Sequence, residues 1–275
     1  MEFKKDFVDL LTLAKNCGQT YIGHGNPNSS ILIVANEPGT VSKDLIENDL
    51  NLNRTRWENN LNDPREMSEL EDVFGNSDFW GRFNPLWPFK GQRFVQERKK
   101  TISPDRVVVL NEAKHPTSRS WYQSQKLVDM IYNKDPICLK HSCDSIDFFE
   151  RAFITDFSAV YGLHSHEISR EARFASIMKR LPLFGSPFFC HFPVIIVASG
   201  HYIHNIDLLN DLTKVFPGFS PNKIERITGD PGWMNVHTSD DGKRILVHTK
   251  HFASAISDPY LTAIALKCRE ILNAQ

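Results

Sequence analysis

The stretch SSILIVANEPGT, residues 29–40, indicates the fold and contains the first candidate functional residues. Its apolar part, Ile31–Ala35, predicts a buried β-strand because the run is short, continuous and rich in β-branched side chains. The strand leads directly into Asn36 and Glu37, which precede a Pro-Gly turn. A carboxamide and a carboxylate at the end of a buried strand require either polar partners or a ligand.

Strand and helix patterns alternate along the rest of the chain, which predicts an α/β fold with a mostly parallel sheet covered on both faces. We expect a single domain over residues 1–275, with an irregular elaboration at about 42–100. The stretch 235–249 is compatible with a hairpin around Asp241 and Gly242. The other strand candidates are Val107–Leu110, Ala152–Thr155, Val194–Ala198 and Ile245–Val247, and the helical patterns cover 3–14, 118–132, 169–181, 202–216 and 257–274.

The composition is typical of a soluble globular protein. The 275 residues are 41% hydrophobic and 24% charged, and no apolar run approaches the ~20 residues of a membrane span. The N-terminal stretch lacks the apolar region of a signal peptide and is typical of an amphipathic helix. The five cysteines are odd in number and scattered, which predicts reduced thiols in a cytoplasmic protein. We expect no membrane association, and a monomer rather than an oligomer.

Charge is unevenly distributed although the net charge is only -1. Residues 62–78 carry six acidic side chains and one arginine, whereas residues 82–100 carry six basic side chains and one glutamate. Phe83, Trp87, Phe89 and Phe94 lie among those bases. Cations and aromatic rings together suit a phosphate backbone and stacked bases. The alternative is that the two stretches pair with each other on the surface.

Polar residues follow several of the predicted strands. Asn36 and Glu37 follow the first, Asp156 ends another, and further histidines and a lysine follow the last two. Any one of them could be a helix cap or a loop residue. In a parallel sheet, however, the carboxyl ends of the strands meet at one edge, and ligands bind there. Their repetition therefore predicts one site, with Asn36, Asp156 and His251 in a common cleft.

These residues resemble motifs of the uracil-DNA glycosylase superfamily. The lead-in YIGHGNPNSSILIV at 21–34 and the turn at 35–39 are similar to the first motif of that family. The stretch His251-Phe252-Ala253-Ser254 resembles its histidine motif, and 91–95 resembles a Gly-x-Pro-Phe-Val element. The resemblance runs loosely from Tyr21 to about Ala263. It implies a three-layer αβα sandwich around a mostly parallel four-stranded sheet, and removal of a damaged or deaminated base from DNA.

The resemblance also implies roles for individual residues. Asp156 stands where the family reads the base edge, usually with Asn, and Phe94 stands where it stacks on the flipped base. Breaking the N-glycosidic bond builds positive charge on the sugar and negative charge on the leaving base. Glu37 is the carboxylate expected near the sugar, Asn36 the residue that helps to place the water, and His251 the residue that stabilises the base. Arg93, Lys250 and Ser254 are expected to contact phosphates.

Several positions depart from the family pattern. Ala35 replaces the usual Gly, Glu37 replaces Asp, Asn or Ala, and the histidine motif lacks its proline. The cluster cysteines of the iron–sulfur branch are missing, and the Cys-x-x-His-x-Cys pattern at 138–143 is too short for a zinc site. We therefore predict no metal and no cofactor.

Two other functions remain compatible with these residues. One is a catalytically inactive module that binds a nucleic acid or a nucleotide, which the ionisable Asp156 favours because a carboxylate cannot donate a hydrogen bond. The other is a hydrolase of a modified nucleotide, which the near-zero net charge favours. In each case the expected partner is DNA or another ligand that contains a nucleobase.

Overall fold

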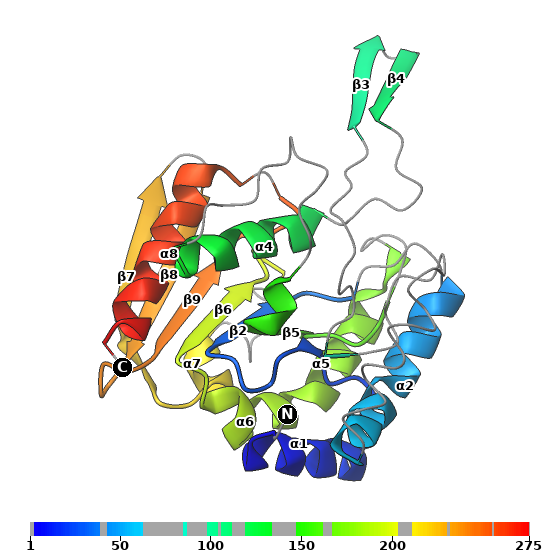
Figure 1. Ribbon diagram of the computed structural model, residues 1–275, viewed down its shortest axis with the longest axis vertical. Helices are drawn as coiled ribbons and strands as arrows, with labels where there is room; N and C mark the ends of the chain where they lie inside the picture. Colours follow the sequence, from blue (N-terminus) through cyan, green and yellow to red (C-terminus); the bar gives the residue numbers. More distant parts are fainter. Residues whose placement is uncertain are drawn as a thin grey trace.

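A seven-stranded mixed sheet forms the centre of the computed structural model (Figure 1). Its strand order is β1-β5-β2-β6-β9-β8-β7. The strands are β1 (His24–Gly25), β2 (Ile31–Ala35), β5 (Ala152–Asp156), β6 (Val194–Ala198), β7 (Phe219–Gly229), β8 (Gly232–Ser239) and β9 (Ile245–Thr249). The structure describes residues 3–38, 43–62, 85–86, 98–103, 106–111, 119–133, 147–161, 167–202, 211–229, 232–254 and 256–274.

The four middle strands of this sheet are parallel to one another. Strand β2 pairs in parallel with β5 on one side and with β6 on the other, and β6 pairs in parallel with β9. Strand β1 pairs antiparallel with β5, and β8 pairs antiparallel with both β9 and β7. The sheet therefore has seven strands, in contrast to the expected four, and the hairpin around Asp241 and Gly242 is confirmed as β8–β9.

Helices pack on both faces of the sheet. Successive side chains of a strand point to opposite faces, so β2 contributes Ile31 and Ile33 to one apolar cluster and Leu32 and Val34 to the other. The first cluster includes residues of α4 (Arg119–Ile131), η1 (Phe148–Glu150) and α8 (Asp258–Leu272). The second includes residues of α1 (Lys5–Asn16), α2 (Lys43–Asn62), α5 (Arg170–Phe184), α6 (Pro187–Cys190) and α7 (Leu212–Val215).

The strand predicted at Val107–Leu110 is confirmed, although it lies outside the central sheet. The apolar run Val107–Leu110 lies in β4 (Arg106–Asn111), which pairs with β3 (Arg98–Ser103) in a separate two-stranded sheet. Such a run predicts a strand but not its partner, and here the partner is the strand immediately before it. Figure 1 shows this hairpin projecting away from the seven-stranded sheet. The pattern at 202–216 is helical over only Leu212–Val215 among its described residues.

The region expected to be irregular, 42–100, begins with a regular helix. Helix α2 spans Lys43–Asn62 and packs on the body of the protein through Trp57, which is fully buried. The Trp57 indole N–H and the Asn53 side-chain amide both donate to the carbonyl of Gly23, at 3.0 Å each. This helix therefore fixes the chain just before β1. Over the described ranges, no helix combines the length and apolarity needed to cross a bilayer.

Candidate functional site

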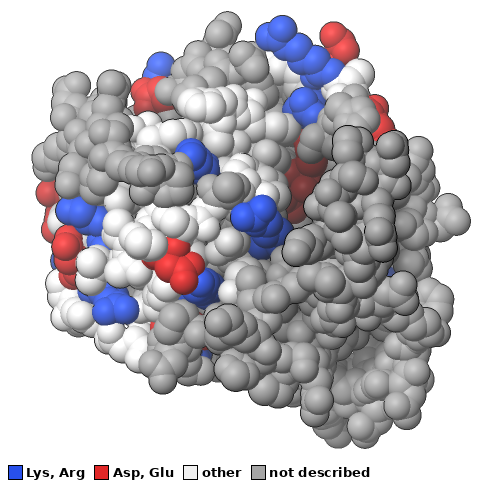
Figure 2. Space-filling view, turned by 90° about the horizontal axis from the view of Figure 1, so that it is seen from above, with Lys and Arg blue, Asp and Glu red and all other residues white. Residues whose placement is uncertain are grey.

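The carboxyl ends of the four parallel strands carry most of the candidate residues. Ala35 of β2 lies in register with Asp156 of β5. The pairing continues beyond the strands, because the N–H groups of Phe157 and Ser158 donate to the carbonyls of Ala35 and Asn36, both at 3.0 Å. Asn36 and Asp156 are thus placed side by side by the backbone. Figure 2 views the molecule from above, and on this face the Lys and Arg side chains that are visible are scattered in separate places.

Glu37 is nearly buried and has two polar partners. Its side chain is 6% exposed, and Arg173 of α5 forms an ion pair with it, with Nε 3.2 Å from Oε2. The Tyr202 hydroxyl, which follows β6, donates to the same Oε2. Within the described ranges, the second oxygen, Oε1, accepts one long hydrogen bond of 3.5 Å, from the Arg173 guanidinium. The expected carboxylate is therefore oriented at the strand end, with one oxygen still able to accept a strong hydrogen bond.

Arg173 and Tyr202 also contact each other. The Arg173 guanidinium lies 4.6 Å from the centre of the Tyr202 ring, a cation–π arrangement. Burial and the neighbouring Glu37 carboxylate raise the pKa of Tyr202 above its ordinary value. The phenol therefore remains protonated and acts as a hydrogen-bond donor to Glu37.

Asp156 is the second buried carboxyl group of the site. The Tyr21 hydroxyl donates to its Oδ2 at 2.7 Å. Burial raises the pKa of Asp156 to about 6, although the Tyr21 hydrogen bond, Arg180 and His24 each lower it. The Glu37 carboxylate raises this pKa further, so the two acidic groups interact electrostatically.

Arg180 of α5 supports the backbone beneath this site. It is fully buried and donates to the carbonyls of Tyr21 and Asp156 and to the Thr155 hydroxyl, the last two at 3.1 and 2.9 Å. The guanidinium plane also lies over the Tyr21 ring, 4.9 Å from its centre. It therefore holds the end of β5 and the segment before β1 together.

His251 lies on the same side as Glu37. Burial lowers the pKa of His251, whereas the Glu37 carboxylate raises it, and the net shift is downward. The imidazole is therefore neutral at pH 7. The Ala253 N–H donates to Nδ1 at 3.4 Å, which assigns the ring proton to Nε2. A neutral ring with an Nε2–H is a hydrogen-bond donor, as expected for a group that contacts a leaving base.

The loop after β6 brings the His251 segment close to the site. Gly200 has φ +58°, and a side chain there would meet the His251 backbone nitrogen at 3.4 Å. The Gly200 carbonyl accepts a hydrogen bond from His248 Nε2 at 2.9 Å, and Ser199 Oγ lies 3.3 Å from the same nitrogen. His248 is 4% exposed. It therefore holds this loop and is not available to a ligand.

Of the other candidate residues, Asn36, Lys250 and Ser254 lie within the described ranges. The Asn36 carboxamide oxygen is buried and has no hydrogen-bond partner in the described part of the chain. Lys250 follows β9 directly, and Ser254 is exposed in the turn after His251, with its N–H on the His251 carbonyl at 2.9 Å. Arg93 and Phe94 lie outside the described residues, as does the Cys-x-x-His-x-Cys pattern at 138–143.

Sequence reasoning missed the residues that hold the two carboxyl groups. Arg173 and Arg180 lie on α5, where a charged side chain is normally interpreted as solvent-exposed. Tyr21 precedes the first motif without any signal of its own, and Tyr202 lies within a range that was expected to be helical. The hydrogen bonds of Tyr21, Arg173 and Tyr202 to the two carboxyl groups join residues 135, 136 and 165 positions apart.

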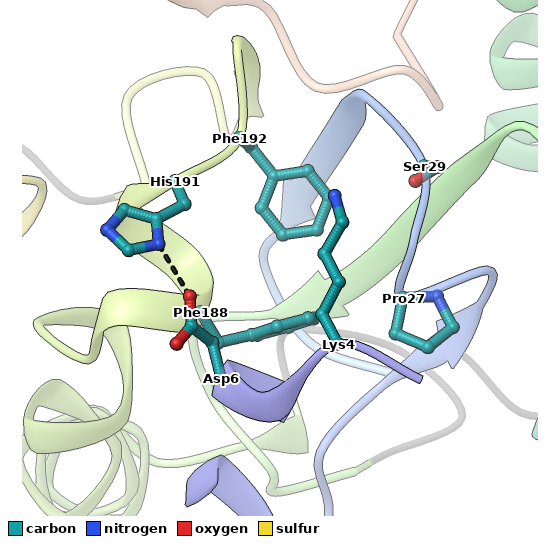
Figure 3. Close-up of a pocket in the computed structure, with 7 residues that line it drawn as sticks. All are labelled: Lys4, Asp6, Pro27, Ser29, Phe188, His191 and Phe192. Carbon is teal, nitrogen blue, oxygen red and sulfur yellow. Dashed lines mark hydrogen bonds and ion pairs between the residues drawn. The ribbon is translucent and has the colours of Figure 1, made fainter. Parts of the chain in front are cut away.

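A shallow recess lies at the opposite end of the sheet (Figure 3). It is near the starts of β2 and β6, and its polar feature is an ion pair between His191 Nδ1 and Asp6, at 2.6 Å. Both side chains of this pair are partly exposed. The recess contains none of the candidate residues and is lined by Lys4, Asp6, Pro27, Ser29, Phe188, His191 and Phe192.

No protein-family model matches this chain, and no curated protein matches it.

Proposed function

We propose that this protein is a uracil-DNA glycosylase-like enzyme that removes a damaged or deaminated base from DNA by hydrolysing the N-glycosidic bond. The observation that supports the proposal is the grouping of Glu37, Asp156 and His251. These residues follow or end three different parallel strands, and Glu37 influences the pKa of both other groups. We also propose that the fold is a three-layer αβα sandwich built around the four parallel strands.

Glu37 acts on the sugar in this mechanism. As the bond to the base breaks, the anomeric carbon becomes electron-poor, and a preorganised carboxylate stabilises it. Arg173 and Tyr202 hold Oε2, so the carboxylate does not reorganise during the reaction. Oε1 accepts a proton from the attacking water, with the Asn36 carboxamide oxygen as a second acceptor for that water.

His251 acts on the leaving base. A neutral imidazole donates its Nε2–H to an oxygen of the base and stabilises the negative charge that develops there. The base reaches this position only after it leaves the duplex, so a stacking surface is needed, and Phe94 is the residue proposed for it. Arg93, Lys250 and Ser254 are proposed to contact the phosphates on either side.

A second function is favoured by one specific observation. The charge of Glu37 is already paired with Arg173, and Tyr202 occupies the same oxygen. A carboxylate neutralised in this way stabilises a positive sugar less than an unpaired one does. This contact favours a module that binds a base-containing nucleic acid without cleaving it.

A base panel tests both functions. The purified full chain is incubated with single- and double-stranded oligonucleotides that carry uracil, hypoxanthine, xanthine or a thymine mismatch, and abasic sites are detected by alkaline cleavage. We expect turnover of at least one base, and binding of the same oligonucleotide in a filter or anisotropy assay. Binding without cleavage would support the inactive module. If the chain neither binds nor cleaves any member of the panel, both proposed functions are overturned.

A further inference from the structure

We propose that His201 and Trp233 form an aromatic subsite on which an unpaired nucleobase next to the excised one stacks, and that the substrate is therefore single-stranded. The inference rests on the proposed function, because it names the substrate class of the same site. It begins from a contact between two rings that the proposed reaction does not use. The ring centres of His201 and Trp233 are 5.1 Å apart, and their planes differ by 32°.

Strand pairing places Trp233 at the end of the sheet that carries the candidate residues. Strand β8 runs antiparallel to β9, and Met234, near the start of β8, is in register with Thr249 at the end of β9. Trp233 directly precedes Met234. The start of β8 therefore brings Trp233 to the carboxyl edge of the parallel strands.

His201 lies in the loop after β6, between two residues that contact the site. The Tyr202 hydroxyl donates to Glu37. On the other side, a side chain at Gly200 would meet the backbone nitrogen of His251 at 3.4 Å. The pair of rings is therefore adjacent to the place where the sugar and the excised base are proposed to bind.

The two aromatic residues differ in burial. Trp233 is partly buried, its backbone carbonyl accepts a hydrogen bond from the Tyr260 hydroxyl, and the buried His248 ring packs edge-to-face against the indole at 4.9 Å. His201, which stacks on the same indole, is exposed. The indole is thus held by the protein, while the residue stacked on it faces solvent. Such a preorganised aromatic pair offers a planar contact surface at low cost in side-chain entropy.

A planar aromatic surface in this position suits an unpaired base. Every nucleobase has a π face, so stacking on an aromatic side chain requires no particular base. In a duplex, the faces of the bases beside the excised one are already covered by their stacked neighbours. In a single strand these faces are available. The subsite should therefore increase affinity for single strands more than for duplexes.

Removing the base from the ligand and the ring from the protein tests the contact. The probe is a single-stranded oligonucleotide that carries the most tightly bound base of the panel, compared with two versions that have an abasic analogue immediately 5′ or 3′ of that base. We expect one of the two versions to bind the wild type roughly 5- to 150-fold more weakly in anisotropy titrations, the usual effect of one base–aromatic stack. His201→Ala and Trp233→Leu should lose this difference, whereas Trp233→Phe should retain most of it.

Strandedness gives a second measurement on the same variants. The wild type should bind the single strand more tightly than the duplex with the same base, and His201→Ala should reduce this ratio. His191→Ala, in the recess at the opposite end of the sheet, is the control and should behave as the wild type. Because His201 is exposed, we expect His201→Ala to keep the wild-type circular dichroism spectrum, which excludes misfolding as the cause.

The outcomes distinguish this inference from the proposed function. If neither abasic version binds the wild type more weakly, if His201→Ala shows the same difference as the wild type, or if the wild type prefers the duplex, the stacking subsite is overturned and the proposed function stands. If the wild type neither binds nor cleaves any member of the base panel, the proposed function is overturned, and the subsite with it.

Discussion

Arg173 and Glu37 form an ion pair across 136 positions of sequence, with Nε 3.2 Å from Oε2. The pair connects the first turns of α5 to the end of β2 and leaves the Glu37 side chain 6% exposed. A buried carboxylate in this setting serves either to hold the strand end or to act on a ligand. The two roles predict different results for the same substitutions.

Glu37→Gln keeps the shape of the side chain and removes its charge. For a glycosylase we expect single-turnover cleavage to slow by a factor on the order of 10² to 10³, the usual cost of losing one preorganised electrostatic group. Binding should be nearly unchanged. Cleavage rate and melting temperature are measured on the same preparation, with Glu270→Gln on α8 as the exposed control. A lower melting temperature with an unchanged rate per folded molecule would assign Glu37 a structural role.

Arg173→Ala leaves the Glu37 carboxylate buried without its cation. Breaking a buried pair in this way is expected to lower the free energy of unfolding by roughly 3 kcal/mol. Chemical denaturation measures it. The double variant Arg173→Ala, Glu37→Gln should recover part of the loss, because it no longer buries an unpaired charge. If the double variant is no more stable than Arg173→Ala alone, the ion pair contributes little to the free energy of unfolding.

Asp156→Asn should change the pH dependence of stability. Because folding raises the pKa of Asp156 from 3.8 to about 6, its favourable contribution is complete below pH 4 and is lost as the pH rises through 6. At about 1.4 kcal/mol per pH unit, the stability of the variant relative to wild type should rise by about 3 kcal/mol between pH 4 and pH 8. Thermal unfolding at several pH values measures it.

Asp241→Asn is the control for that series. Hydrogen bonds from the Ser239 hydroxyl and the Lys243 N–H lower the pKa of Asp241. Its contribution is therefore present above the ordinary pKa of Asp and is lost as the pH falls, so the variant should show the opposite trend. Parallel pH profiles for the two variants would contradict the raised pKa of Asp156.

Lys90→Ala with Arg93→Ala tests the basic, aromatic stretch at 82–100, most of which lies outside the described residues. If both side chains contact phosphates, the slope of log affinity against log salt should become shallower by about one unit for each lost contact. Anisotropy titrations with a single-stranded oligonucleotide at several salt concentrations measure the slope. A slope equal to that of the wild type would favour pairing of this stretch with the acidic residues 62–78.

The sequence predicted the centre of the sheet and the grouping of Asn36 and Asp156 at one end of it. The run Ile31–Ala35 is apolar on both faces and so predicts a strand that is covered on both faces, and in the structure its side chains pack into apolar clusters on both faces of the sheet. The sequence also predicted that Asn36 and Asp156 lie at one edge, because the carboxyl ends of neighbouring parallel strands lie at the same edge of a sheet. These inferences use only short-range patterns and the rule of strand alternation.

The sequence could not predict the partners of the two carboxyl groups. Arg180 is fully buried on a helix, although charged side chains are normally placed on the outer face. Its position depends on carbonyl groups at Tyr21 and Asp156 that are brought together only by the complete sheet. The same limit applies to Val107–Leu110, which was correctly predicted as a strand but whose pairing with β3 is not encoded in its apolar pattern.

The ladder that continues beyond β2 and β5 makes the site observable by amide hydrogen exchange. The N–H groups of Phe157 and Ser158 are bonded to the carbonyls of Ala35 and Asn36, so they exchange with solvent only when the two strand ends separate. Deuterium uptake at these two amides therefore reports the opening of the site directly. A ligand that binds between Asn36 and Asp156 should slow their exchange without altering that of the β3–β4 hairpin, and this would map the binding site without any assay of catalysis.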